Sequence, residues 1–266
     1  MLTSVRNPLV KEARKLQQAK GRRSHQQFLI EGTHLVQEAL AMGYPLVTLC
    51  ATPAWQQRHP QLWDQAIAVI PRTETVSLAV VAAMATTVNP DGVIAIAAYP
   101  QTAFGADIAP PELPQLGIAV ETLQDPGNLG SLLRTATAAH CDGIWLTPDS
   151  VDPVHPKVLR ASAGQWFRLP QVICEDLASQ LGQWQQAGCQ ILATGSQGAM
   201  PYWQVDLCQP PVIVLGNEGA GLSPAVQAAA TDTIAIPMAP GVESLNVGVA
   251  AAVILFEAQR QRQTRP

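Results

Sequence analysis

The sequence predicts an α/β protein in which a domain with a mostly parallel sheet follows a smaller α/β domain. The main observation is a set of near-continuous apolar runs in the second half of the chain, which alternate with helical segments. The second is a proline-rich break between residues 100 and 114. With 266 residues, of which 47% are hydrophobic and 14% charged, the chain is long enough for two domains with buried cores.

The first domain is expected over residues 1–99, where helical and strand-like segments alternate. Apolar residues at helical spacing predict helices over 8–18, 32–42 and 77–84. Short apolar runs predict strands over 28–30, 46–50, 66–70 and 93–98.

Residues 100–115 are expected to form a linker, because prolines at 100, 110, 111 and 114 and the lack of periodicity argue against a helix or strand. The second domain, residues 116–266, restarts the alternation. Its strands are predicted over 117–122, 143–147, 190–194, 211–215 and 233–236, with helical segments between them. Because these runs are apolar throughout, they indicate a mostly parallel sheet that is covered on both faces.

The composition argues against several classes of protein and site. The apolar run 247–256 is shorter than the roughly 20 residues that cross a bilayer, and residues 1–10 lack the apolar core of a signal peptide, so we expect a cytoplasmic protein with no membrane contact. Five cysteines without a CxxC pair and five histidines without ligand spacing predict neither disulfides nor a metal site. No P-loop, GxSxG or strand-linked GxGxxG motif is present.

Positive charge is concentrated at the N-terminus, although the whole chain has a net charge of −4. Residues 1–30 contain seven arginines and lysines and one glutamate, a local charge of +6. One interpretation is the solvated face of an amphipathic helix. The other is an arm that binds RNA phosphates, and its candidate residues are Arg6, Lys11, Arg14, Lys15, Arg22 and Arg23.

The second domain opens with a loop that leads into a helix, over residues 123–136. Asn128 is the predicted N-cap, because Asp125 to Gly127 interrupt the strand before it. Arg134 follows six residues later, which at about 100° per residue places it about 120° around the helix from Asn128. The two side chains are expected to border one cleft without touching. Taken alone, Arg134 is typical of an exposed helix face.

Two further loops follow the last two predicted strands. The strand at 211–215 opens into residues 216–223, and the strand at 233–236 opens into residues 237–247. Both loops are rich in glycine and polar residues, and both lead into helices. They are therefore predicted to form two walls of one ligand pocket.

These three segments resemble, in order, the three motifs of the SpoU (TrmH) branch of the SPOUT superfamily, whose members are S-adenosylmethionine-dependent RNA ribose 2′-O-methyltransferases. The matching residues are Asn128-x-Gly130-x-x-x-Arg134-Thr135-Ala136, Gly216-Asn217-Glu218-Gly219-x-Gly221-Leu222, and Ile236-Pro237-Met238 through Ser244-Leu245-Asn246-Val247. Near the N-terminus, Asn7-Pro8-x-Val10-Lys11 and Phe28-Leu29-Ile30-Glu31-Gly32 resemble the small RNA substrate-binding domain of the family.

The resemblance implies that the second domain contains a deep trefoil knot, an exception to the rule that chains avoid knots. It also implies that the knot loops bind S-adenosylmethionine in a bent pose through backbone groups. The cofactor-binding residues implied in this way are Gly216, Asn217, Gly219, Ile236, Met238, Ser244 and Leu245.

For catalysis, the resemblance implies a central Arg134 surrounded by Asn128, Glu218, Ser244 and Asn246. A ribose 2′-hydroxyl must attack the methyl group of a sulfonium and lose its proton. The resemblance implies that Arg134 is a base helped by the RNA phosphate, but a guanidinium normally stays protonated. The alternative role for Arg134 is a cation that stabilises the developing alkoxide. Two structural alternatives also stand: Ser244 as N-cap of the last helix, and Asn246 as a polar residue of its first turn.

The resemblance implies a homodimer that pairs through the C-terminal helices, and residues 245–256 offer an apolar helical face for this contact. The type of N-terminal domain indicates ribosomal RNA in preference to tRNA as the substrate. Two alternatives remain: a tRNA ribose 2′-O-methyltransferase, or a non-catalytic RNA-binding or assembly protein that keeps the knot.

Overall fold

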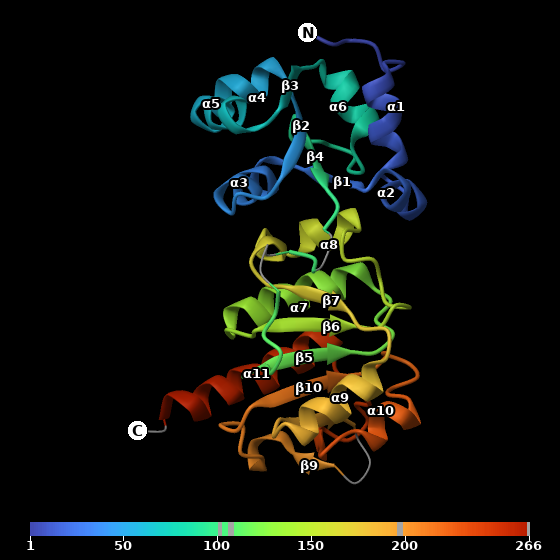
Figure 1. Ribbon diagram of the computed structural model, residues 1–266, viewed down its shortest axis with the longest axis vertical. Coiled ribbons are helices and arrows are strands. Elements are labelled where there is room, and N and C mark those ends of the chain that lie inside the picture. Colours follow the sequence, from blue (N-terminus) through green and yellow to red (C-terminus); the bar gives the residue numbers. More distant parts are fainter. Residues whose placement is uncertain (101–102, 106–108, 196–198, 265–266) are drawn as a thin grey trace. The chain divides into compact units, whose positions relative to one another are not determined.

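The computed structural model describes residues 1–100, 103–105, 109–195 and 199–264. The chain divides into two compact units (Figure 1). The N-terminal unit consists of Met1–Gln101 together with Val154–Phe167, and the sheet unit consists of Thr102–Pro153 and Arg168–Pro266. These bounds differ from the predicted domains, because residues 154–167 were expected in the second domain. Part of the predicted linker lies outside the described residues, but Phe104 forms an antiparallel bridge with Gln171.

The N-terminal unit contains a four-stranded sheet in the order β1-β4-β2-β3, in which only the β2–β3 pair is parallel. The strands are β1 (Gln27–Glu31), β2 (Leu46–Ala51), β3 (Arg72–Thr75) and β4 (Val93–Ala98). The predicted helices correspond to α1 (Pro8–Lys15), α3 (Thr33–Ala41) and α6 (Leu78–Met84). Asn7 caps α1 by accepting a hydrogen bond from the Leu9 amide at 2.9 Å.

The predicted strand over 66–70 is wrong. Most of it forms the end of α5 (Pro60–Val69), which follows α4 (Pro53–Arg58). A five-residue apolar run fits a strand or a buried helix turn equally well. Pro60 in the first turn of α5 was the available helix signal. The strand of this region is the polar edge strand β3, which an apolar pattern does not reveal.

The sheet unit is built on seven parallel strands in the order β7-β6-β5-β10-β8-β11-β9, which confirms the mostly parallel sheet. The bounds are β5 (Gly117–Val120), β6 (Gly143–Leu146), β7 (Gln171–Ile173), β8 (Gln190–Thr194), β9 (Met200–Pro201), β10 (Pro211–Leu215) and β11 (Asp232–Ala235). The central strand β10 is buried along its whole length.

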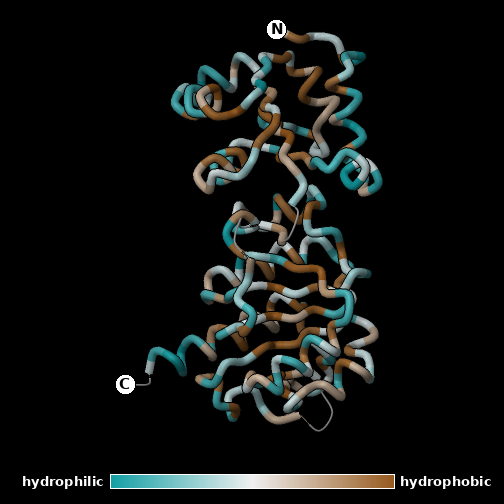
Figure 2. The backbone as a smooth tube through the Cα atoms, in the orientation of Figure 1, coloured by the Kyte–Doolittle hydropathy of each residue, from teal (hydrophilic) through white to brown (hydrophobic). Residues whose placement is uncertain are grey.

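Helices cover both faces of this sheet (Figure 1). On one side, α9 (Leu177–Gln186) and α10 (Pro224–Ala228) pack on alternate residues of β10, Val212 and Val214. On the other side, α7 (Pro126–Ala138) packs against α11 (Val247–Thr264). Figure 2 shows the hydrophobic residues gathered along the strands of the sheet. None of the helices described by the structure is long and apolar enough to cross a membrane.

Two short helices occupy Val154–Phe167, the part of the N-terminal unit that comes from the middle of the chain. These are α8 (Pro156–Ala161) and the 3₁₀ helix η1 (Gln165–Phe167). A further helix, α2 (Ala19–His25), follows α1 closely. A side chain at Gly21 would overlap the Lys15 carbonyl oxygen, so glycine permits this tight passage.

Candidate active site

A cavity of about 920 Å³ lies where the strands β8, β10 and β11 end. Ligands of open α/β sheets bind at this carboxyl edge. One wall is the loop after β10 and another is the loop after β11, as the two glycine-rich and polar segments predict. All seven residues expected to bind the cofactor line the cavity: Gly216, Asn217, Gly219, Ile236, Met238, Ser244 and Leu245.

Asn217 and two glycines shape the first wall. The Asn217 Oδ1 accepts hydrogen bonds from the amides of Gly219 at 2.9 Å and Ala220 at 3.0 Å, while its Nδ2 donates to the Thr122 carbonyl at 2.9 Å. A Cβ atom at Gly216 would lie 2.5 Å from the carbonyl carbon of Gly221, which is closer than any side chain permits. The loop therefore folds back on itself, and the amides of Asn217 and Gly221 each donate to the carbonyl of the other residue.

A chain of hydrogen bonds joins the three sequence motifs inside this site. The Asn246 Nδ2 donates to the Asn128 Oδ1 at 2.8 Å, and the Asn128 Nδ2 donates to the Glu218 carboxylate. Asn128 lies 90 positions before Glu218 and 118 before Asn246, but the three residues share one network at the cavity wall. The network fixes the start of α7 relative to both loops.

The caps of the two helices at this site differ from the sequence predictions. Asp125, not Asn128, caps α7, and its Oδ1 accepts from the amides of Gly127 at 2.6 Å and Asn128 at 3.0 Å. Asn246, not Ser244, caps α11, and its Oδ1 accepts from the Gly248 amide at 3.0 Å. Because Asp125 satisfies the first-turn amides, the side chain of Asn128 is available for the two motif loops.

The cavity brings together four of the five predicted catalytic residues, namely Asn128, Glu218, Ser244 and Asn246. Arg134 is exposed on α7, and it is not among the described residues that line the cavity. Of the two α7 residues predicted to border one cleft, Asn128 lines this cavity and Arg134 does not. The structure therefore leaves the predicted role of Arg134 as a proposal.

Several residues that line the cavity were not among the predicted site residues. Thr194 and Gly195 follow β8, and Ile254 projects from α11. The Thr194 Oγ1 donates to the Val214 carbonyl at 2.9 Å, which ties the ends of two neighbouring strands together. Thr194 and Gly195 could have been predicted, because the predicted strand 190–194 ends at the same edge of the parallel sheet as the strands before the two loops.

The cavity suits a nucleoside with a charged tail. Ile236, Val242 and Leu245 offer an apolar surface to a base, while Glu218 and Glu243 offer carboxylates to a cationic group such as a sulfonium. Among the residues that the structure describes, no group of three or more histidine, cysteine, aspartate or glutamate side chains is placed to hold a metal ion.

The basic N-terminal residues divide into two groups. Exposed side chains belong to Arg6, Lys11, Arg14, Lys15 and Arg23, which we call the basic arm. The expectation for Arg22 is wrong, because Arg22 is only 1% exposed. Its Nη1 donates to the carbonyls of Leu16 at 3.2 Å and Gln17 at 3.1 Å, just after the end of α1. Arg22 therefore holds the α1–α2 corner and is not accessible to RNA.

Two family descriptions match the chain. Residues 115–256 match the SpoU rRNA Methylase family, and residues 7–95 match the MRM3-like substrate binding domain. The two matched regions correspond to the second and first predicted domains.

Relatives match over nearly the whole chain. An "Uncharacterized tRNA/rRNA methyltransferase" of Synechocystis sp. is 47% identical over 98% of this chain and 94% of its own length. The 23S rRNA (guanosine(2553)-2′-O)-methyltransferase RlmP of Bacillus subtilis is 30% identical over 96% of this chain and 97% of its own.

A solved structure gives the same result for the fold. The AdoMet-bound rRNA methyltransferase of Sinorhizobium meliloti superimposes with a TM-score of 0.85 at 33% identity, covering 97% of both chains. The motifs, the cavity that they form and the matched residues agree. The chain therefore belongs to the SpoU rRNA methylase family.

Proposed function

We propose that this protein transfers a methyl group from S-adenosylmethionine to a ribose 2′-hydroxyl of ribosomal RNA. The observation that carries the proposal is the hydrogen-bonded chain Asn246–Asn128–Glu218, which joins the three motifs at the wall of one cavity. The RNA class is supported by relatives such as RlmP that are named as 23S rRNA 2′-O-methyltransferases.

S-adenosylmethionine would be held by the two loops at Gly216, Asn217, Gly219, Ile236, Met238, Ser244 and Leu245, where it supplies an electrophilic methyl group on a sulfonium. Glu218 is held by Asn128 at the rim, so its carboxylate is fixed before the ligands bind. Ser244 and Asn246 would orient the ribose and its phosphate. Arg134 is proposed to grip that phosphate and to stabilise the alkoxide as the hydroxyl loses its proton.

Methyl transfer tests the proposal directly. The purified protein, given tritiated S-adenosylmethionine and RNA from a strain that lacks its gene, should label the 23S rRNA at one ribose. Label in tRNA alone would favour the tRNA alternative. Binding of RNA without any label would favour the non-catalytic alternative.

We further propose that the protein is a homodimer. Val249 and Phe256 of α11 are 49% and 48% exposed, which leaves apolar surface on the last helix. A second copy of this helix would cover it. Sedimentation at micromolar concentration should show a dimer, and a stable monomer would contradict the proposal.

The trefoil knot and the cytoplasmic location are also proposals. The family membership and the position of β10 between β5 and β8 support a knot formed by the chain after β10. A crystallographic chain trace in which α11 does not pass through the loop after β10 would exclude it. Cell fractionation tests the location, and recovery with membranes would contradict it.

A further inference from the structure

Val154–Phe167, which we call the crossing segment, follows β6 and precedes β7 of the sheet unit but packs within the N-terminal unit. The chain therefore passes between the two units after residues 101, 153 and 167. The single linker that the sequence predicts is only one of three connections.

Aromatic packing anchors the end of the crossing segment. Trp166 and Phe167 are completely buried. The Trp166 ring centroid lies 5.3 Å from that of Phe28 and 5.5 Å from that of Tyr44, and Phe167 lies 5.4 Å from Tyr44. Because such side chains bury large apolar areas, this cluster belongs to the core of the N-terminal unit.

The turn before these aromatic residues fits closely against α3. Gly164 has φ of +81°, and a Cβ atom there would lie 2.4 Å from the Glu38 Cγ. The His34 Nε2 donates to the Ala163 carbonyl at 3.0 Å. Glycine at 164 therefore serves both the backbone conformation and the close approach.

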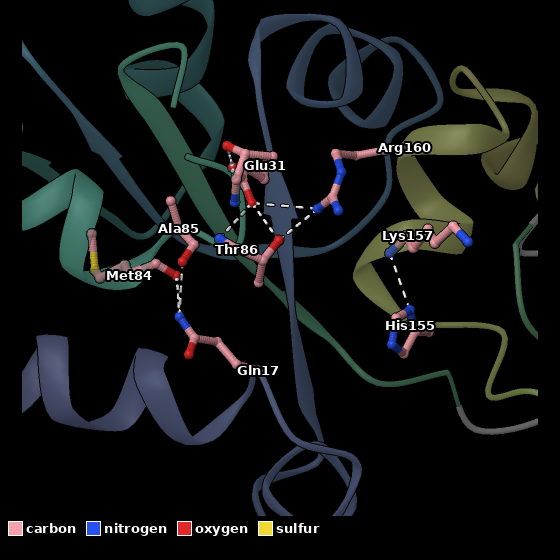
Figure 3. A network of polar contacts seen from close by, with 9 residues as sticks. Gln17, Glu31, Met84, Ala85, Thr86, His155, Lys157 and Arg160 are labelled. Carbon is pink, nitrogen blue, oxygen red and sulfur yellow. Dashed lines mark hydrogen bonds and ion pairs between the residues drawn. The ribbon is translucent and has the colours of Figure 1, made fainter. Parts of the chain in front are cut away.

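A buried carboxylate fastens the beginning of the crossing segment (Figure 3). Glu31, at the end of β1, is only 9% exposed. Its oxygens accept from the Thr86 amide at 2.9 Å, the Thr86 hydroxyl at 2.8 Å, the Thr87 amide at 3.2 Å and the Thr87 hydroxyl. Arg160 of α8 completes the network, since its Nη1 lies 3.5 Å from Glu31 and donates to the Thr86 hydroxyl at 2.6 Å.

Holding α8 through this network costs free energy, because the Glu31 carboxylate is removed from water. A buried carboxylate is stabilising only when its hydrogen bonds and its charge are satisfied, and apolar contacts would hold α8 at a lower desolvation cost. Unlike apolar contacts, these directional hydrogen bonds fix the orientation of α8 relative to β1 and the loop after α6.

We propose that Glu31 and Arg160 are positioning residues for methyl transfer, which act by fixing the crossing segment in the N-terminal unit. This inference rests on the proposed function. RNA held by the N-terminal unit must reach the cavity of the sheet unit in a reactive geometry, and the crossing segment is covalently continuous with both units. In this proposal, neither Glu31 nor Arg160 touches RNA or cofactor.

The test uses the full chain with E31Q, R160M and the double variant. Each should accelerate amide hydrogen exchange at Thr86, at Thr87 and through α8. The dissociation constants for S-adenosylmethionine and RNA should stay unchanged, while the single-turnover rate at saturating RNA falls by on the order of tenfold. The double variant should resemble the more severe single variant, because the two side chains act as one unit. E74Q is the matched control, since Glu74 pairs with Arg72 at 2.9 Å within β3.

Three outcomes would overturn the inference. The first is faster exchange with an unchanged single-turnover rate. The second is RNA affinity lost in proportion to the rate, which indicates a direct RNA contact. The third is unchanged exchange in both single variants. If the parent protein labels no RNA at all, the proposed function fails by itself, and the exchange measurement still decides whether Glu31 fastens the crossing segment.

Discussion

Asn128 is the residue on which the site depends most, because its amide both accepts from Asn246 and donates to Glu218. An asparagine side chain can make both bonds because its amide carries an acceptor oxygen and a donor NH₂ group. Asn128 therefore forms hydrogen bonds with both loops of the cavity.

Exchanging donor and acceptor tests this network. N128D places a second carboxylate beside Glu218, so it should weaken S-adenosylmethionine binding on the order of tenfold through repulsion. In N128D/E218Q, the new glutamine can donate to the new aspartate, and most of the affinity measured by calorimetry should return. Equal affinity for the parent and N128D would show that the network does not shape the cofactor site.

Arg134→Ala tests the arginine that the sequence places at the centre of catalysis. Because Arg134 does not line the cavity, the variant should bind S-adenosylmethionine as the parent does. If Arg134 acts mainly in the transition state, as proposed, turnover should fall on the order of a hundredfold or more. Calorimetry and single-turnover labelling check the two parts. Loss of cofactor affinity, or a nearly unchanged rate, would contradict the proposed role.

At the scale of single elements, α1 divides its residues between two tasks. Leu9, Val10 and Ala13 are buried against the core, while Lys11, Arg14 and Lys15 are exposed at spacings of three and four that share one face. This geometry permits both interpretations of the basic arm, since a solvated face and a phosphate-binding face look alike.

Charge reversal decides between them. If Lys11, Arg14 and Lys15 contact phosphates, K11E/R14E/K15E should weaken RNA binding, and each lost contact should flatten the log–log salt dependence by roughly 0.7 to 0.9. S-adenosylmethionine affinity should not change, because the cavity belongs to the sheet unit. The same reversal at Arg72, an exposed residue of β3, is the control. An unaltered salt slope in the triple variant would leave only the solvated helix face.

At the scale of the whole molecule, acid should act on the N-terminal unit through Glu31. Burial by itself would raise the pKa of Glu31, but hydrogen bonds from Thr87 and Thr86 and the attraction of Arg160 hold its pKa below the ordinary 4.5. A depressed carboxylate pKa contributes stability that is present above the ordinary value and is lost as the pH falls through the folded-state value.

The N-terminal unit should therefore lose stability as the pH falls below about 4.5. Amide exchange at Thr86, Thr87 and α8, measured between pH 6 and roughly pH 3 and corrected for intrinsic rates, reports the change. E31Q should remove that part of the pH dependence, and E74Q should retain it. An equal acid response in E31Q and the parent would show that Glu31 is not the group responsible.

The sequence predicts the parallel sheet from its apolar runs, and it predicts the family and both loops of the cavity from its three motifs. Its predicted site residues do not include Thr194, Gly195 or Ile254, which also line the cavity. Continuous apolar runs at 190–194 and 211–215 match β8 and β10 residue for residue, because strands buried on both faces leave a local pattern. The two loops after β10 and β11 were predictable as one pocket, because parallel strands of one sheet end at the same edge, and only β8 separates these two.

The roles of individual side chains depend on tertiary contacts that the sequence does not show. Asp125 and Asn128 are both suitable caps by composition, and only the approach of Glu218 and Asn246 shows which one serves the site. Arg22 belongs to a basic stretch, but the turn between α1 and α2 buries it against two carbonyl groups. The crossing segment has no signal in sequence order, because its partners Glu31 and Phe28 lie more than a hundred residues earlier. Local patterns record burial and backbone conformation, whereas these outcomes depend on contacts between distant parts of the chain.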